Sequence, residues 1–555
     1  MTLKALLFPV LCMAALAAGA QEGWQYLSFA ESGIYGAGVD RAHAIARGLK
    51  PAKTITVALI GFGLDVDHRD VKASIWNNPK EKPNGRDDDG DGRIDDLHGW
   101  NFLGNATTTL NAISREGDRE FMRLREKYGQ DGIVVGDMVY RYDAQAGKLV
   151  EAPWPENREE FEYFRRLIPE SELAQGYMGI TLAKGVVAFI HDLDRRLRQK
   201  FPGKRLTQQD FASIVDKKRA TEFEKNMYDL VALMFVSTGA DSWDKVVEYA
   251  DTKYVPYQER GYERLLQKTR LDDRRTVGDD VHNLNDTRYG NNNLKAENAG
   301  YGTMLAGIVG AKPGGEEGVN GVATNVRIMS LRVDAGARDE SYVKDVALAI
   351  RYAVDRGAEI IQLGRSNTLY PPEGRWVDEA LRHAEEKGVL VVQPVMDYSY
   401  NLDDQPFYPN RHVAGGELTN MITVAASDES GAPLKTVNFS PTELDLFAPG
   451  VNIKSTCADG AYALGTGSAY AAAMVTGTAA LIKSYYPHIG PAAMRRLIMS
   501  SVNPNGDAEV EKQFYQYRNG QRGRLVTDLF LFSELSATGG VLDAGKALAA
   551  AADIK

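Results

Sequence analysis

The segment LGTGSAYAAAMVTGTAALI, from Leu464 to Ile482, decides the fold of this chain. Its glycines predict a turn, and the small apolar residues that follow predict a buried helix. Enzymes often present a nucleophilic serine at such a turn between a strand and a helix. Ser468 and Ala469 both stand at the start of the helix, so the presence of a nucleophile depends on which of them lies at the point of presentation.

Composition limits the function to a few classes. The chain has 555 residues, of which 44% are hydrophobic and 25% charged, so it can bury a large core. Its 65 basic and 75 acidic side chains give a net charge of -10, with no dense basic cluster. These values predict a globular protein and argue against nucleic acid as a partner.

The N-terminus has the pattern of a cleaved export signal. Residues 1–20 hold a single Lys4, a long apolar run and an A-x-A pattern that ends at Ala20. This pattern is typical of a secretory signal peptide. We therefore expect a mature chain that begins at Gln21 and resides in the periplasm or outside the cell.

The mature chain would keep Cys457 as its sole cysteine, which excludes an intramolecular disulfide. Its uninterrupted apolar runs, such as 185–190 and 229–236, are far shorter than the roughly 20 residues that a membrane span needs. We expect no membrane span after the signal is removed.

Short apolar runs alternate with helical patterns in much of the chain. Residues 54–62, TITVALIGF, predict a strand buried on both faces. Between 341 and 357 the apolar residues recur at helical spacing and end at Gly357, a suitable C-terminal cap. The alternation predicts an α/β fold with a doubly wound, mainly parallel sheet. Further strands are expected within 325–333, 358–364, 388–395, 421–426 and 444–448.

Residues 104–300 differ in texture, because they form long, charged segments with helical periodicity. Thr207 with Asp210 resembles a capping box at a helix start. We expect a large, mostly helical insertion. The predicted organisation is a signal peptide at 1–20, an N-terminal segment at 21–53, an α/β domain at 54–103 and 301–555, and the insertion at 104–300.

Three separated stretches resemble the subtilisin-like serine peptidases, or subtilases. Residues 57–71, 301–311 and 447–482 are similar to the family segments that carry the catalytic aspartate, histidine and serine. Further matches follow in family order at 321–333, 388–397 and 535–548. The resemblance implies a subtilisin-like fold over 54–103 and 301–550.

The same resemblance implies that the catalytic residues are replaced. It equates the family's aspartate with Gly61, the histidine with Tyr301, the serine with Ala469 and the oxyanion-hole asparagine with Asp397. A serine nucleophile needs a base to accept its proton, and a carboxylate to orient that base. A phenol with an ordinary pKa near 10 is a poor base, and a carboxylate would repel a developing oxyanion. Asp65, His68 and Asp70 match positions that flank the family's aspartate, so none is that aspartate displaced.

The substrate cleft also departs from the family pattern. The family's S-L-G sequence corresponds to Gly364, Arg365 and Ser366. The Arg365 guanidinium either projects into the cleft or extends to solvent. Met304 replaces a second family histidine, and Ala473 replaces the proline of the serine segment.

One functional feature is retained in residues 84–102, NGRDDDGDGRIDDLHGWNF. Carboxylates at alternate positions around a glycine are typical of an EF-hand-type calcium loop, although His98 stands where that loop has a glutamate. The alternative is a solvated acidic turn. We expect a structural Ca²⁺ bound by Asp87, Asp89, Asp91, the Arg93 carbonyl and Asp95.

Together these features predict an exported subtilase-fold protein without peptidase activity. Such a protein would act by binding an unidentified protein or peptide, as a decoy, scaffold or regulator. The rival hypothesis is an endopeptidase or other hydrolase with relocated catalytic residues, and a third is a paralogue with no selected role. Candidate bases for the rival are His68, His98, His191, His282, His383, His412 and His488.

Overall fold

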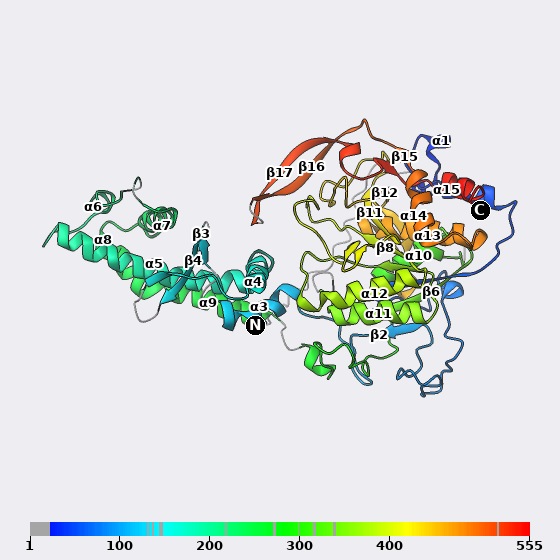
Figure 1. The fold of residues 1–555 in the computed structure, drawn as a ribbon, viewed down its shortest axis with the longest axis horizontal. Helices are drawn as coiled ribbons and strands as arrows, with labels where there is room; N and C mark the ends of the chain where they lie inside the picture. The colour runs from blue at the N-terminus through cyan, green and yellow to red at the C-terminus, as the bar shows by residue number, and fades with distance from the viewer. Residues whose placement is uncertain are drawn as a thin grey trace, which may run out of the picture.

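The structure is a computed structural model that describes residues 23–554 apart from 130–132, 136–137, 144–147, 217, 219, 270–272, 298, 315–317, 337–339 and 519–520. The signal peptide expected at residues 1–20 therefore lies outside the described residues. Figure 1 shows a sheet domain with an elongated helical arm beside it.

A nine-stranded sheet forms the centre of the sheet domain, in the order β15-β18-β12-β11-β8-β7-β1-β6-β2. Its strands pair in parallel except for β15 with β18 at one edge. This arrangement confirms the predicted fold class. The bounds are β1 Ile55–Gly61, β2 Gly99–Asn101, β6 Val326–Arg332, β7 Ile360–Leu363, β8 Leu390–Pro394, β11 Met421–Ser427, β12 Leu446–Pro449, β15 Asn503–Pro504 and β18 Gly540–Val541.

Helices cover both faces of this sheet because its strands are apolar on both sides. Along β1, Val57 and Leu59 pack in one core cluster, whereas Ala58 and Ile60 pack in another. The first cluster includes residues of α2 Val39–Ala46, α10 Ala299–Gly310, α13 Ser468–Tyr485, α14 Pro491–Ser500 and α15 Ala544–Ala551. The second includes residues of α11 Val343–Asp355 and α12 Arg375–Glu386.

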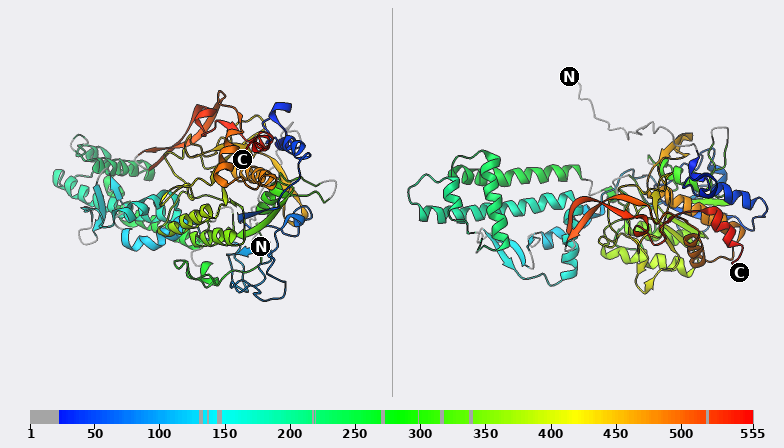
Figure 2. Two further views of the ribbon diagram at one scale, coloured as in Figure 1. Left: turned by 45° about the vertical axis from the view of Figure 1, so that its right-hand side comes forward. Right: turned by 90° about the horizontal axis from the view of Figure 1, so that it is seen from above.

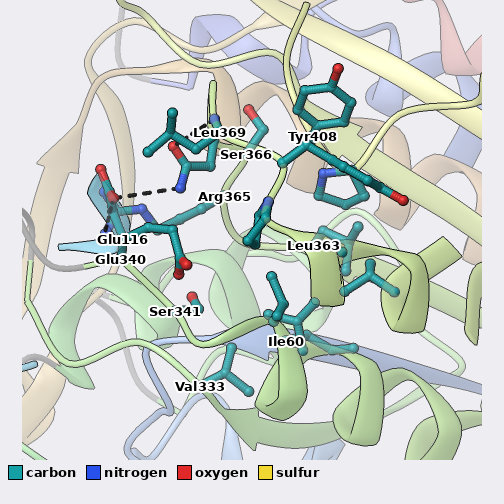
Figure 3. Close-up of a pocket in the computed structure, with 18 of the residues that line it drawn as sticks. Ile60, Glu116, Val333, Glu340, Ser341, Leu363, Arg365, Ser366, Leu369 and Tyr408 are labelled. Atoms are coloured by element: carbon teal, nitrogen blue, oxygen red, sulfur yellow. Dashed lines mark hydrogen bonds between the residues drawn. The ribbon is translucent and has the colours of Figure 1, made fainter. Parts of the chain in front are cut away.

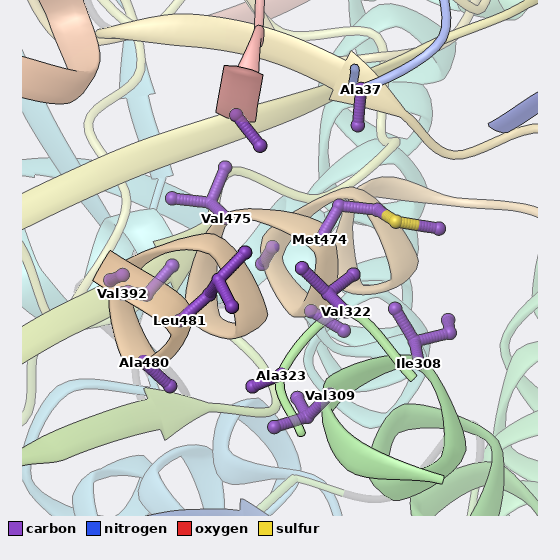
Figure 4. Packing of buried hydrophobic residues seen from close by; sticks show 14 of the residues in the cluster. Ala37, Ile308, Val309, Val322, Ala323, Val392, Met474, Val475, Ala480 and Leu481 are labelled. Atoms are coloured by element: carbon purple, nitrogen blue, oxygen red, sulfur yellow. The ribbon is translucent and has the colours of Figure 1, made fainter. Parts of the chain in front are cut away.

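Helix α13 is the segment quoted first, and it crosses the middle of the core. Figure 4 shows Met474 of this helix near Val322, in the core cluster that also contains Val475 and Ile308. Its glycine is needed for this packing, because a Cβ on Gly477 would lie 2.6 Å from the Val322 Cβ. The small residues of the segment therefore allow the helix to approach its neighbours closely.

The insertion forms the helical arm, and Figure 2 shows it projecting from the sheet domain. The Thr207 and Asp210 capping box is present at the start of α6. The arm also contains an antiparallel three-stranded sheet that the sequence patterns did not indicate, with β3 Ile133–Val135, β4 Met138–Asp143 and β5 Lys148–Ala152. Its helices are α3 Glu116–Tyr128, α4 Arg158–Glu170, α5 Glu172–Lys200, α6 Gln208–Ala212, α7 Glu222–Thr238, α8 Trp243–Tyr249 and α9 Val255–Lys268, with a π-helical turn at Ala250–Tyr254.

One helix of the described residues, α5, is long and apolar enough to cross a membrane by length and composition alone. Of its most apolar 18-residue window, 44% is buried inside the protein. Val186, Ile190 and Leu193 of this helix pack in the core of the arm. A core helix meets the same length and composition criteria, so the expectation of no membrane span stays a prediction.

The sequence analysis did not identify a long hairpin near the C-terminus, although the dipeptide Asn519-Gly520 between two runs of residues is a hairpin signal. The hairpin consists of β16 Glu509–Arg518 and β17 Gln521–Leu531, and Figure 1 shows it reaching toward the helical arm. Arg522 donates a hydrogen bond to the Pro169 carbonyl at 3.1 Å, so this strand touches the end of α4. The remaining elements are α1 Phe29–Ser32, β9 His412–Val413, β10 Gly416–Glu417, β13 Ile453–Thr456, β14 Tyr462–Gly465 and 3-10 helices at Trp24–Tyr26, Lys72–Ser74, Asp273–Thr276, Pro372–Gly374, Ala458–Gly460 and Phe532–Glu534.

Candidate functional site

The structure brings together the three positions that the resemblance equates with a catalytic triad. Gly61 ends β1, Tyr301 lies in α10, and Ala469 lies in the first turn of α13. The Tyr301 ring is 4.8 Å from the ring of Phe62 and 5.3 Å from the ring of Tyr470, measured between centroids. Tyr301 therefore packs between Phe62, which follows Gly61 in the chain, and Tyr470, which follows Ala469.

None of these three side chains has the chemistry of a triad member. Burial raises the pKa of the Tyr301 phenol well above 10, so it keeps its proton at neutral pH. Ala469 has no nucleophilic atom and is 2% exposed. A Cβ on Gly61 would lie 3.7 Å from an Asp334 carboxylate oxygen, so an aspartate there would meet a like charge.

Asp397 occupies the N-terminal end of α13. Its carboxylate accepts hydrogen bonds from the Ser468 backbone N–H at 3.1 Å and from the Ser468 hydroxyl at 2.7 Å. A helix N-terminus attracts negative charge, and a developing oxyanion would need donors of this kind. The Asp397 carboxylate therefore occupies the Ser468 donors that an oxyanion would need. Burial raises the pKa of this carboxyl group above its ordinary value.

The loop that carries Asp397 is held in an unusual backbone conformation. Met396 and Ser399 on either side have φ angles of 66° and 63°, in the left-handed region. The Asn438 side chain fixes this loop, because its Oδ1 accepts the Tyr398 N–H at 3.1 Å and its Nδ2 donates to the Val395 carbonyl at 2.7 Å.

Lys512 of the hairpin supports the segment that contains Asn438. Its fully buried ammonium donates to the carbonyls of Leu434, Lys435 and Val437 at 2.7, 3.1 and 2.7 Å. Burial lowers the pKa of Lys512 to about 7. The hairpin therefore helps to position Asp397, although no sequence motif pointed to Lys512 or Asn438.

Arg365 is half-buried and lines a pocket of the sheet domain. Its guanidinium donates to the Gly336 carbonyl at 3.2 Å and lies 5.8 Å from the centre of the Phe62 ring. Gly364 packs against β1, where a Cβ would lie 2.8 Å from the Ile60 carbonyl oxygen. Ser366 is buried, and its hydroxyl lies 3.4 Å from the Pro394 carbonyl.

Beside Arg365 lies a small pocket of about 80 Å³, drawn in Figure 3. Its floor is apolar, with Ile60, Val333 and Leu363 from the sheet domain. Glu116 of the insertion and Glu340 stand at its edge, where the Glu116 N–H donates to the Glu340 carboxylate at 2.7 Å. The insertion therefore helps to form a wall of the pocket.

The seven candidate histidines do not join Asp397 and Ser468 in the described part of the chain. Each has another partner: His68 the Ala461 carbonyl, His98 the Trp76 carbonyl, His191 Asp251, His282 Glu373, His383 Asp355, His412 Glu443 and His488 the Ile554 carbonyl. Asp65 pairs with Lys295 at 2.9 Å, and Asp70 accepts hydrogen bonds from Tyr462 and the Gly314 N–H.

The acidic loop brings Asp87 and Asp89 together with Glu81, which the sequence reasoning missed. One carboxylate oxygen from each of the three lies within 4.8 Å of the others. Glu81 precedes the loop in a polar stretch, and no regular spacing marks it as a ligand.

The other expected ligands have different partners. Asp95 accepts the backbone N–H groups of Asn84 and Gly85 at 3.0 Å. Asp91 pairs with the Arg93 side chain at 3.0 Å and with Arg356 at 2.5 Å.

Comparison with known proteins identifies the class. The Peptidase_S8 profile, which describes the subtilase family, matches residues 52–517, so the chain belongs to the subtilase family and the predicted resemblance is confirmed.

Two curated relatives illustrate the similarity. The chain is 31% identical over 184 residues to the thermophilic serine proteinase of Bacillus sp. strain AK1. This match covers 33% of this chain and 42% of that protein. It is 30% identical over 203 residues to the major intracellular serine protease of Bacillus subtilis strain 168. This match covers 37% of this chain and 61% of that protein. The matched segments thus span less than two thirds of either relative. Among solved structures, one described as proteases from Pseudoalteromonas arctica gives a TM-score of 0.35 at 23% identity, over 45% of this chain and 70% of that one.

Proposed function

We propose that this subtilase-family protein is exported, lacks peptidase activity and acts by binding a protein or peptide. The observation that carries the proposal is the filled centre. Tyr301 is packed between Phe62 and Tyr470, and Asp397 takes the donors of Ser468 at the start of α13. Hydrolysis needs a nucleophile, a base and oxyanion donors, and side chains without these roles occupy the three positions.

Binding surfaces remain beside the filled centre. The pocket of Figure 3 offers an apolar floor for a side chain, and Arg365 adds a positive charge to its lining. The helical arm adds exposed apolar side chains, with Leu233 58% and Val236 74% exposed on α7. Such exposed apolar groups favour a protein partner for the arm.

Casein hydrolysis and partner capture test this proposal. The purified mature chain should release no peptides from casein, with or without calcium. Immobilised protein should retain a partner from the native exported fraction, and the Leu233→Asp/Val236→Asp variant should retain less if α7 contributes. Casein cleavage by protein free of contaminating peptidase would contradict the proposal.

The competing function is hydrolysis through Ser468, since its hydroxyl donates to the Asp397 carboxylate at 2.7 Å. A carboxylate can accept a proton from a nucleophile. Ser468 is fully buried, however, and the hydrogen bond also serves to cap the helix. We favour the capping role. Activity that Ser468→Ala abolishes would instead support hydrolysis.

We also propose a structural Ca²⁺ in the acidic loop, held by carboxylates of Asp87, Asp89 and Glu81. The residues fit a hard cation, because all three offer carboxylate oxygens and Glu81 Oε2 has no hydrogen-bond partner among the described residues. When bound, the ion would neutralise the loop and stabilise the fold. Calcium at a hundredfold excess over its dissociation constant should add about 2.7 kcal/mol to the free energy of unfolding. An identical melting temperature in calcium and in chelator would contradict this.

A further inference from the structure

The Glu81 carboxylate beside the acidic loop is only partly satisfied by hydrogen bonds. It is 7% exposed, and its Oε1 accepts the N–H groups of Asp88 and Asp89 at 2.9 and 3.1 Å. Its Oε2 is buried and has no partner among the described residues, yet it belongs to a carboxylate grouped with Asp87 and Asp89. A buried carboxylate oxygen without a donor is costly, so this geometry favours a cation.

A protein cation already touches the same loop from α11. Arg356 follows the last residue of that helix, and its guanidinium pairs with Asp89 and, at 2.5 Å, with Asp91. It also lies 3.3 Å from the buried carboxylate of Asp96. The Arg356 side chain is only 12% exposed, so water screens these contacts weakly.

A single guanidinium cannot balance this loop. Arg356 contacts three carboxylates, while Glu81 and Asp87 have no ion pair with it among the described contacts. Asp87 instead accepts backbone N–H groups, from Gly90 at 2.7 Å and Gly92 at 2.8 Å. Among the described contacts, Glu81 and Asp87 therefore have no ion pair, whereas Asp91 pairs with both Arg356 and Arg93.

We propose that Glu81 is a ligand of the calcium site and that the Arg356 guanidinium competes with Ca²⁺ for the carboxylates of the loop. This competition would lower the affinity of the loop for calcium. The inference rests on the calcium proposal above. Glu81 reaches the ion from upstream of the loop and supplies the carboxylate that His98 cannot. Asp89 is shared, because its carboxylate faces both the Glu81 group and Arg356. Arg356 thereby keeps the loop folded without metal and weakens metal binding by repulsion.

Isothermal calorimetry with Ca²⁺ on the full mature chain tests both residues. Glu81→Gln should weaken calcium binding at least about tenfold, because a ligand charge is lost. Arg356→Gln should tighten it by about ten- to thirtyfold, since a positive charge beside a divalent ion is removed. The matched control is Arg351→Gln on the same helix, whose side chain pairs with Glu379 and which should bind calcium like the wild type.

Melting curves give a second readout that does not depend on the calorimetry. Arg356→Gln should melt below the wild type in chelator and should gain more than the wild type when calcium is added. Glu81→Gln should gain less. Equal calcium affinities for the wild type and Arg356→Gln would overturn the role of Arg356 while leaving the calcium proposal intact. An unchanged affinity in Glu81→Gln would remove Glu81 from the proposed ligands and leave Asp87 and Asp89 to hold the ion. If neither the wild type nor Arg356→Gln binds calcium, both the inference and the calcium proposal fail, and binding through the cleft and arm is unaffected.

Discussion

Four buried charged side chains connect the segment that follows the helices of the insertion to the sheet domain. Their charge balance predicts how strongly a single substitution will destabilise the protein. Arg274 pairs with Asp279 at 2.8 Å and with Asp345 of α11 at 2.7 Å. Lys344 pairs with Asp279 at 2.7 Å. Tyr289 donates to Asp345 at 2.5 Å, and the four charges sum to zero.

Arg274→Met should destabilise the protein strongly, because it leaves two buried carboxylates facing one ammonium. Removing one partner of a buried ion pair typically costs about 3–5 kcal/mol. At roughly 2–4 °C per kcal/mol for a large domain, the melting temperature should fall by about 6 °C or more. Differential scanning calorimetry measures this loss, and the neighbouring exposed Arg275→Met is the control that should change little.

Adding Asp345→Asn to Arg274→Met should recover at least about 1 kcal/mol, because Lys344 and Asp279 then balance each other. Burial already raises the pKa of Asp345 against the opposing effect of Arg274. Without Arg274 this pKa rises further, above its unfolded value, so the folded state favours the protonated form. The deficit of Arg274→Met relative to the wild type should therefore shrink as pH falls from neutrality toward about 4. Strictly additive losses in the double variant, or a deficit independent of pH, would refute the charge-balance reasoning.

Three further changes test the loop, the hairpin and the arm. Asp397→Ala should lower the free energy of unfolding by about 1–3 kcal/mol, because the Ser468 donors lose their acceptor, and chemical denaturation measures the loss. Lys512→Met should lower the free energy of unfolding by at least about 2 kcal/mol, whereas the control Lys435→Met should change it little. Because burial lowers the pKa of Lys512 to about 7, the wild type should gain stability over Lys512→Met as pH rises from 7 toward 10. Ser171→Ala should cost about 1–2 kcal/mol in thermal unfolding, because Ser171 caps α5 through its hydroxyl.

The sequence predicted the parts of this protein that depend on local pattern. The run at 54–62 is mostly apolar at successive positions, which predicted β1 as a strand buried on both faces, and similar runs predicted its parallel neighbours. The turn and small residues of 464–482 likewise predicted α13. The family resemblance of 301–311 and 447–482 also equated Tyr301 and Ala469 with triad positions, and the structure places the Tyr301 ring 5.3 Å from the ring of Tyr470, which follows Ala469.

The remaining features depend on contacts between distant residues. Lys512 and Arg356 meet their partners only after the chain folds, and a lone lysine or arginine has no spacing that would mark it. Glu81 joins Asp87 and Asp89 through a loop of polar residues without periodicity. The β3–β5 sheet lies in a segment that is otherwise dominated by helical patterns. The hairpin of β16 and β17 does have a local signal in Asn519-Gly520, but its contacts with the sheet domain depend on distant residues.

The central claim is that the filled catalytic centre has no nucleophile, and reaction with a fluorophosphonate probe followed by intact-mass spectrometry tests it most directly. The account predicts no adduct on the wild type, and none on Ala469→Ser, because triad members act as a unit and Tyr301 and Gly61 supply no base or orienting carboxylate. A stoichiometric adduct on the wild-type protein that disappears in Ser468→Ala would contradict the account.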